Sequence, residues 1–88
     1  MKKNISQEKI FSFRVIIEPD KPAGYHGFVP LLPGVHTGGK TVEQTKKNLR
    51  EAIECHLQGL LKDKEVIPQE SEAWEFVQTF SVGNLTSA

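Results

Sequence analysis

The sequence predicts an α+β fold in which the elements follow the order β-β-β-α-β. An antiparallel or mixed sheet of four strands would carry one long helix on one face. Three observations support this: apolar and polar residues alternate over 10–18, apolar residues recur with a helical period over 42–62, and a second alternation covers 74–82. The helix would be about 31 Å long and the first strand nearly as long, so one helix can lie along one face of the sheet.

The three N-terminal strands are separated by residues typical of turns. The first strand, 10–18, is followed by Pro19-Asp20-Lys21-Pro22-Ala23-Gly24, a turn composition that leads into a second extended run over 25–32. Pro33-Gly34 closes that run, and a short third strand is predicted over 35–37. Gly38-Gly39 is predicted to break the backbone before the helix.

The helix has a clear start signal. Thr41 is followed three residues later by Gln44, which is the capping-box pattern, so we predict that these two residues form a structural cap. The residues that follow recur at three- and four-residue spacing on one apolar face, as expected for a helix packed on a sheet. They are Val42, Leu49, Ala52, Ile53, His56, Leu57, Leu60 and Leu61.

The last predicted strand, 74–82, is rich in aromatic residues. A single helix covers only one face of a four-stranded sheet, and apolar residues also fall on the other side. A chain of this size buries only roughly 60–65% of the surface that its unfolded form exposes, a marginal fraction that often makes oligomerisation useful. We therefore expect a homo-oligomer, a dimer or a tetramer, with a candidate interface formed by Ile10, Ile16, Trp74, Phe76 and Phe80.

Composition excludes several classes of protein. The 88 residues carry eleven Lys and Arg against eleven Asp and Glu, so the basic surplus of a nucleic-acid binder is missing and no direct nucleic-acid binding is expected. No run of about 20 apolar residues is present, so no membrane span or association is expected. The single cysteine, Cys55, cannot form an internal disulfide, which indicates a reducing, cytoplasmic environment. The prediction is one domain over 1–88, with a core at about 10–82.

Candidate chemical motifs are weak. Gly34 to Thr41 matches the phosphate-loop pattern, but Pro30 and Pro33 occupy the place of the buried strand that should precede it. A second strand of apolar residues that ends in an Asp, which would hold the metal ion, is also missing. Glu18 and Asp20 lie where an RNase H-type enzyme would begin its carboxylate set, yet the last strand offers only Glu75. The three histidines have no ligands at metal-binding spacing. We therefore predict no catalytic, cofactor-binding or metal-binding residue and no enzyme activity.

The sequence resembles the HicB family of antitoxins. Four features carry the resemblance, which covers about 13–68: an extended segment ending in Ile-x-Pro-Asp and followed by Gly-Tyr, a Val-Pro-x-Leu-Pro-Gly stretch, a glycine turn, and a capped helix. They are Phe13 to Asp20 with Gly24-Tyr25, Val29 to Gly34, Thr37 to Thr41, and Asn48 to Ile53. In the family an acid often stands where this chain has Lys40, and Lys46, Lys47 and Arg50 make the helix more basic than the family's partner would suggest.

The resemblance implies a partial RNase H-like domain without nuclease chemistry. It implies a non-catalytic antitoxin that assembles into oligomers and neutralises a HicA-type mRNA-cleaving toxin by covering its active surface. Many members carry an added DNA-binding module, but after Glu70 only a strand and a tail are predicted here, so no separate DNA-binding domain is expected. Two alternatives stay open: a stand-alone oligomeric domain of this type that binds another protein or a small ligand, and a nucleotide-binding protein that uses Gly34 to Thr41.

Overall fold

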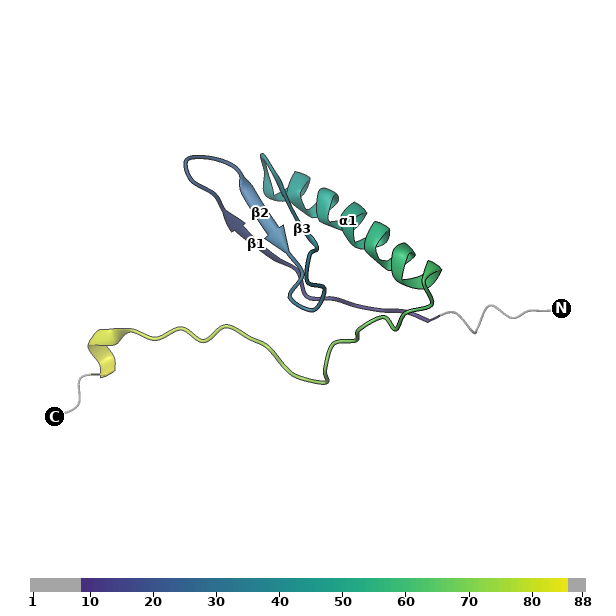
Figure 1. Ribbon diagram of the computed structural model, residues 1–88. Helices are drawn as coiled ribbons and strands as arrows, with labels where there is room; N and C mark the ends of the chain where they lie inside the picture. Colours follow the sequence, from purple (N-terminus) through teal and green to yellow (C-terminus); the bar gives the residue numbers. More distant parts are fainter. Residues whose placement is uncertain (1–8, 86–88) are drawn as a thin grey trace.

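The computed structural model describes residues 9–85, the side chain of Asn84 excepted, and shows three antiparallel strands with one helix packed against them (Figure 1). The strands are β1 (Ile16–Pro19), β2 (Tyr25–Phe28) and β3 (His36–Gly39), in the order β1-β2-β3. The helix α1 (Val42–Lys62) follows directly, and a short 3₁₀ helix, η2 (Val82–Leu85), ends the described chain. The α+β class and the single helix on one face are therefore confirmed.

The strands are shorter than the alternation predicted. Residues 10–15 are extended but form no ladder, and β1 begins only at Ile16. β2 stops at Phe28, two residues before Pro30, because proline cannot donate a ladder hydrogen bond. The prediction that Gly38-Gly39 breaks the backbone was wrong: both glycines belong to β3 and pair with His26 and Tyr25.

The helix has the predicted bounds, 42–62. Thr41 occupies the N-cap position with extended backbone angles, and its Oγ1 accepts a hydrogen bond from the Gln44 N–H at 3.0 Å. The Gln44 side chain reaches back, and its Oε1 accepts from the Lys40 N–H at 3.1 Å, one residue before the cap. These contacts satisfy backbone donors that a helix start otherwise leaves without partners.

Removing the cap hydroxyl is expected to destabilise the fold measurably. Thr41→Ala should lower the free energy of unfolding by about 1 kcal/mol, because the Gln44 N–H loses its acceptor. Thr41→Ser keeps the oxygen and should be nearly neutral. Urea denaturation of the three proteins measures both effects, and equal stability of all three would show that this contact does not stabilise the helix start.

The core lies between the sheet and the helix. Val29, Leu32 and Val35 form a buried cluster from the connection between β2 and β3, and partly buried Phe13, Ala52 and Ile53 pack against it. Leu49 is 1% exposed and faces Gly27 of β2, where an added Cβ would lie 2.4 Å from the Leu49 Cδ1. Glycine at this position therefore lets the helix approach the sheet closely.

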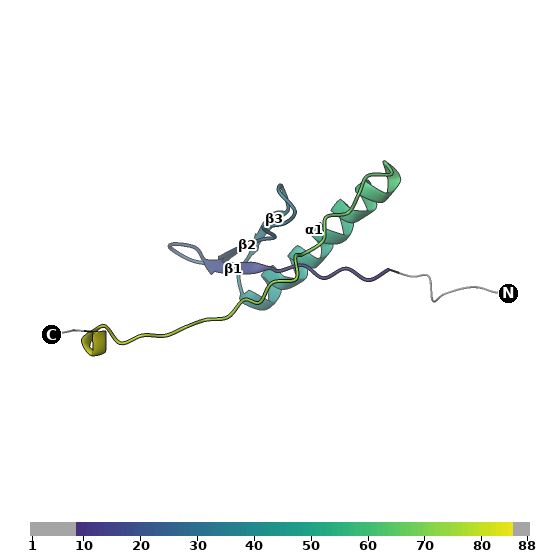
Figure 2. The same cartoon turned by 90° about the horizontal axis from the view of Figure 1, so that it is seen from below.

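The fourth strand predicted over 74–82 is not formed. This segment is extended but has no ladder partner in the described chain, and its apolar side chains are exposed: Trp74, Phe76, Val77, Phe80 and Val82. Figures 1 and 2 both show it leaving the body of the domain and ending beyond the β1–β2 hairpin. The physical reason is that alternating apolar residues specify a strand with a covered face, and neither the helix nor the sheet of the same chain supplies that cover.

Candidate protein-binding surface

An exposed cluster of two carboxylates and a histidine lies at the end of the β1–β2 hairpin. The register places Glu18 directly opposite His26, and the turn after Pro19 brings Asp20 to the other side of the imidazole ring. His26 Nδ1 lies 2.6 Å from Asp20 Oδ1, and Nε2 lies 3.0 Å from Glu18 Oε1. Both ring nitrogens can donate to carboxylates only in the imidazolium form. The geometry therefore favours a protonated His26.

The same contacts set the acid–base behaviour of His26. The hydrogen bond to Asp20 is the main cause that raises the pKa of His26 above its ordinary value, and Glu18 adds to it, while partial desolvation opposes it. When the ring is neutral, the cluster carries two negative charges, and when the ring is protonated, it still carries one. These three side chains thus keep a net negative charge over the whole neutral range, while Lys21 in the same turn and Lys40, which lines a cleft with Asp20, add positive charge nearby.

The pKa of His26 should therefore be above that of a free histidine and should fall when Asp20 is neutralised. Because the folded-state pKa is raised, the stabilising contribution is complete below the ordinary pKa of about 6.5 and is lost as the pH rises through the folded-state value. Histidine NMR titration of the wild type, Asp20→Asn and Glu18→Gln measures the shift. We expect Asp20→Asn to lower the pKa of His26 more than Glu18→Gln does. An unchanged pKa of His26 in both variants would show that neither carboxylate contacts the ring.

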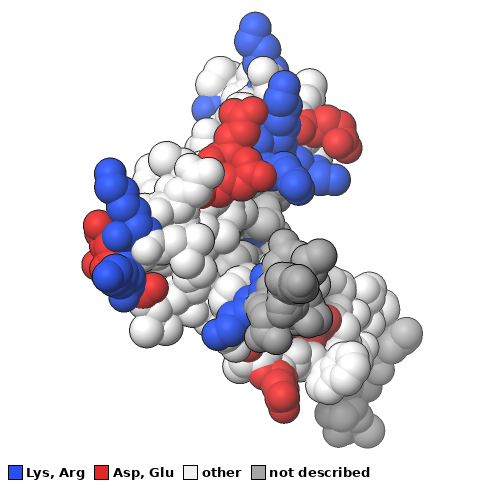
Figure 3. Space-filling view, turned by 90° about the vertical axis from the view of Figure 1, so that its right-hand side faces the viewer, with Lys and Arg blue, Asp and Glu red and all other residues white. Residues whose placement is uncertain are grey.

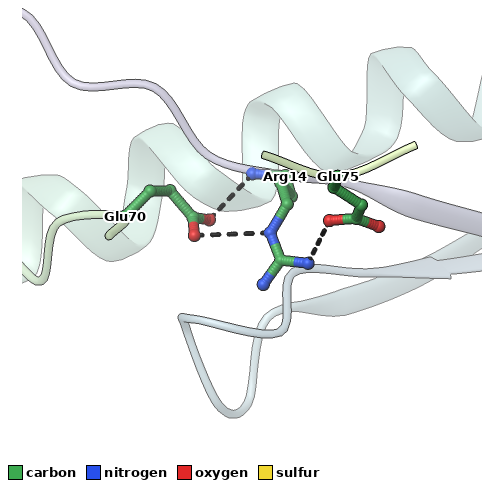
Figure 4. Close-up of polar contacts among 3 residues, drawn as sticks. All are labelled: Arg14, Glu70 and Glu75. Atoms are coloured by element: carbon green, nitrogen blue, oxygen red, sulfur yellow. Dashed lines mark hydrogen bonds and ion pairs between the residues drawn. The ribbon is translucent and has the colours of Figure 1, made fainter. Parts of the chain in front are cut away.

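A second polar cluster links the segment just before β1 to the segment that follows α1. Arg14, before β1, bonds to both Glu70 and Glu75 (Figure 4). Its guanidinium contacts both carboxylates, and its backbone N–H also donates to Glu70 at 3.0 Å. Glu75 first and Glu70 second raise the pKa of Arg14, which stays charged in any case. These contacts hold residues 70–75 beside the N-terminal side of β1, although no ladder forms.

An open groove lies between α1 and Val15, the residue just before β1. Its volume is about 360 Å³; its apolar lining comes from Val15, Leu49 and Ile53, and its charged rim comes from Lys46, Arg50 and Glu54. Val15 is substantially exposed, whereas Leu49 is buried and Ile53 half-buried. This is an apolar surface with charged edges, which is the usual anatomy of a protein–protein contact.

The predicted interface residues do not form one patch. Ile16 and Phe76 line the same cleft, together with Val77 and the Arg14–Val15 stretch. Ile10 lies elsewhere, in a cleft with Phe11, Ser12 and Glu70. Trp74 and Phe80 are 93% and 70% exposed and line neither of these clefts. Four of the five residues are exposed, and Ile16 is half-buried. The interface itself stays a prediction.

The phosphate-loop match acquires a different meaning in the structure. Residues 36–39, in the middle of the match, form β3 and are paired with β2, so they do not form a loop that could wrap around phosphates. The strand before the helix is antiparallel to its neighbour, whereas phosphate loops follow a parallel strand. Thr41 is engaged as the helix cap. The segment is a short strand leading into a capped helix.

Charge and ligand chemistry give no sign of other site types in the described part of the chain. Within residues 9–85 no group of three His, Cys, Asp or Glu side chains is arranged to hold a metal ion. No helix there is both long and apolar enough to cross a membrane. Figure 3 shows acidic and basic side chains interleaved on the face that it presents, without a broad basic area.

Comparison with known proteins agrees with this fold. Residues 13–84 match the family model described as HicB-like antitoxin of bacterial toxin–antitoxin systems. A UPF0150 protein of Synechocystis is 33% identical over 66 residues, 75% of this chain and 84% of the relative. A UPF0150 protein of Thermoplasma acidophilum is 39% identical over 59 residues, 67% of this chain and 86% of the relative.

A solved structure matches as well. The crystal structure of the N-terminal domain of the Burkholderia pseudomallei antitoxin HicB superposes with a TM-score of 0.59 at 33% identity, covering 83% of this chain and 76% of that one. The family match thus spans the sheet, the helix and the C-terminal segment. The chain belongs to the HicB-like antitoxin family of bacterial toxin–antitoxin systems.

Proposed function

We propose that this chain is a non-catalytic antitoxin domain, with a partial RNase H-like fold, that neutralises a HicA-type mRNA-cleaving toxin in the cytoplasm by covering its active surface. The observation that carries the proposal is the family match over residues 13–84, which is accompanied by the structural likeness to an antitoxin domain at 33% identity. As a member of this family, the chain would bind a toxin protein as its partner.

The environment of the carboxylates supports a role without catalysis. A nuclease of the RNase H type needs several acids that converge on metal ions. Here Glu18 and Asp20 both turn to His26, and Glu75, the acid that the sequence offered to complete a set, bonds to Arg14. The acids are therefore engaged with cationic partners rather than with one another. This arrangement fits a binding surface better than a hydrolytic centre.

We further propose that the acidic hairpin end contacts the toxin. Glu18 and Asp20 are 56% and 47% exposed at their side chains, and the cluster keeps a net negative charge. A HicA-type toxin acts on RNA and is expected to present a cationic active surface. An acidic patch complementary to it would speed association and fix orientation. The helix, with Lys46, Lys47 and Arg50, is less suited to a cationic partner.

Binding to a HicA-type toxin whose gene neighbours that of this chain tests the proposal, and the absence of such a gene would count against it. We expect the two proteins to co-elute, and Glu18→Gln with Asp20→Asn to weaken the affinity about tenfold or more, mainly through slower association at low salt. Glu43→Gln with Glu51→Gln removes the same charge from the helix and serves as the matched control. No complex at micromolar concentration would contradict the proposed function, and equal affinities of both double variants would contradict the hairpin contact.

Association of copies is a second part of the proposal. The chain is expected to form a dimer or a tetramer, because the extended C-terminal residues expose apolar surface that a small domain cannot cover alone.

A further inference from the structure

The C-terminal arm, defined here as residues 74–85, is an apolar segment without charge over most of its length. From Phe76 to Leu85 the sequence contains no Asp, Glu, Lys or Arg. Its aromatic side chains are 70% exposed or more. An uncharged extended segment of this composition readily pairs with other strands. A stable protein therefore needs a defined cover for it.

The arm runs in the same direction as the N-terminal part of the chain. Arg14 bonds to Glu70 and Glu75, and one cleft is lined by Arg14 to Ile16 together with Glu75 to Val77. A second cleft, nearer the N-terminus, is lined by residues 10–12 together with Gln69 and Glu70. The two segments thus advance side by side as parallel neighbours, and Val77 is near the level of Ile16.

The arm is longer than the strand beside it. β1 ends at Pro19, three residues and about 10 Å after Ile16. At the same advance per residue the arm reaches the level of Pro19 near Phe80, and Val82 and Leu85 lie beyond the end of the strand. Both ribbon views show this overshoot past the hairpin (Figures 1 and 2). The distal part of the arm therefore has no strand of its own chain to cover it.

The same chain also has an open apolar groove that could receive an aromatic side chain. The groove between Val15 and α1 has Val15, Leu49 and Ile53 as its apolar lining, and no arm residue of the same chain lines it. An apolar cavity of about 150 Å³ can already bind benzene, so a groove of about 360 Å³ has room for an aromatic ring. Groove and arm are thus complementary.

We propose that two copies of this chain exchange their C-terminal arms. The Arg14 contacts with Glu70 and Glu75 fix the base of each arm on its own domain, and beyond them the arm crosses to the partner. Its distal face, with Phe80 and Val82, lies in the groove of the second copy. Exchange across a two-fold axis buries both arms and fills both grooves at once. The chain's zero net charge adds no repulsion between copies.

Cysteine cross-linking between two different variants tests the exchange directly. In a Cys55→Ser background, proteins carrying Val15→Cys and Phe80→Cys are mixed, allowed to re-equilibrate in mild urea, and exposed to a short bifunctional maleimide. We expect a covalent dimer from the mixture and little from either variant alone. The double variant Val15→Cys with Phe80→Cys should also give dimers, whereas an arm folded back on its own chain would give internally linked monomers and would overturn the proposal.

Charge substitutions on the two faces of the arm test how much the exchanged arm contributes to the stability of the dimer. Phe80→Asp should raise the dimer dissociation constant about a hundredfold or more, since each dimer loses two buried rings. Thr79→Asp adds the same charge to the adjacent residue, which faces the other way, and should change it much less. Equal effects of the two substitutions would contradict the assigned face.

Light scattering on the wild type separates the possible failures. The exchange rests on the association of copies proposed above and not on toxin binding, so it is measured without toxin. A monomer at micromolar concentration would overturn both association and exchange. A dimer without mixed cross-links would retain association and overturn exchange, and neither result would bear on toxin neutralisation, which the binding assay measures separately.

Discussion

Leu49→Ala is expected to lower the free energy of unfolding by about 3 kcal/mol, the largest effect of any single substitution considered. Leu49 is 1% exposed and lies where α1 crosses β2. Truncating a fully buried leucine loses its transfer free energy and leaves a cavity, at a cost of about 2–5 kcal/mol. A domain of this size has a total stability of about 4–13 kcal/mol, so the variant would approach the limit of folding.

Leu61→Ala is the matched control, on the same helix. Leu61 is 63% exposed, so the same chemical change should cost less than about 0.5 kcal/mol. Both variants are compared by urea denaturation at one protein concentration, since association makes apparent stability depend on concentration. A similar loss for the two leucines would show that α1 does not pack on the sheet through Leu49.

Gly27→Ala is expected to lower the free energy of unfolding by about 2 kcal/mol. A Cβ at this position would lie 2.4 Å from the Leu49 Cδ1 and 3.2 Å from the Ile16 carbonyl oxygen. Overpacking of a close contact typically costs about 1–3 kcal/mol. Because Leu49 is the main obstacle, Gly27→Ala combined with Leu49→Ala should cost less than the two single changes added together.

Gly59→Ala provides a control of opposite sign. Gly59 lies in α1 with nothing within 4 Å of an added Cβ, so alanine should stabilise the helix by about 0.5–1 kcal/mol. The comparison uses the same urea experiment. If Gly27→Ala and Gly59→Ala change the free energy of unfolding in the same direction, the close approach of helix and sheet at Gly27 is contradicted. Strict additivity of Gly27→Ala and Leu49→Ala in the double variant would contradict it as well.

The helix could be predicted from the sequence because local signals determine it. Thr41, Gln44 and the apolar period act over a few residues, and the helix begins and ends where they indicate. The strands were less predictable, since alternation marks an extended segment but not the presence of a neighbour. Residues 10–15 and 74–82 alternate clearly, yet they form no ladder in the described chain.

Most of the candidate site could not be predicted from the sequence, because strand pairing and tertiary contacts, not a sequence motif, bring its members together. Glu18, Asp20 and His26 come together through the antiparallel register and the turn after Pro19. The predicted hairpin could have brought Glu18 near His26, but their direct pairing depends on Pro19 belonging to β1 and facing Tyr25. No local signal pairs Arg14 with Glu70 and Glu75, which are 56 and 61 residues away. Such contacts depend on how the C-terminal segment returns along the sheet.

Inhibition of RNA cleavage tests the central proposal, antitoxin function, most directly. A purified HicA-type toxin from a neighbouring gene is incubated with an mRNA while the concentration of this chain is raised. We expect cleavage to fall linearly and to stop near one binding site per toxin, because a protein that covers the active surface acts stoichiometrically. Cleavage that continues at full rate with a tenfold excess of the folded chain would contradict the proposed function.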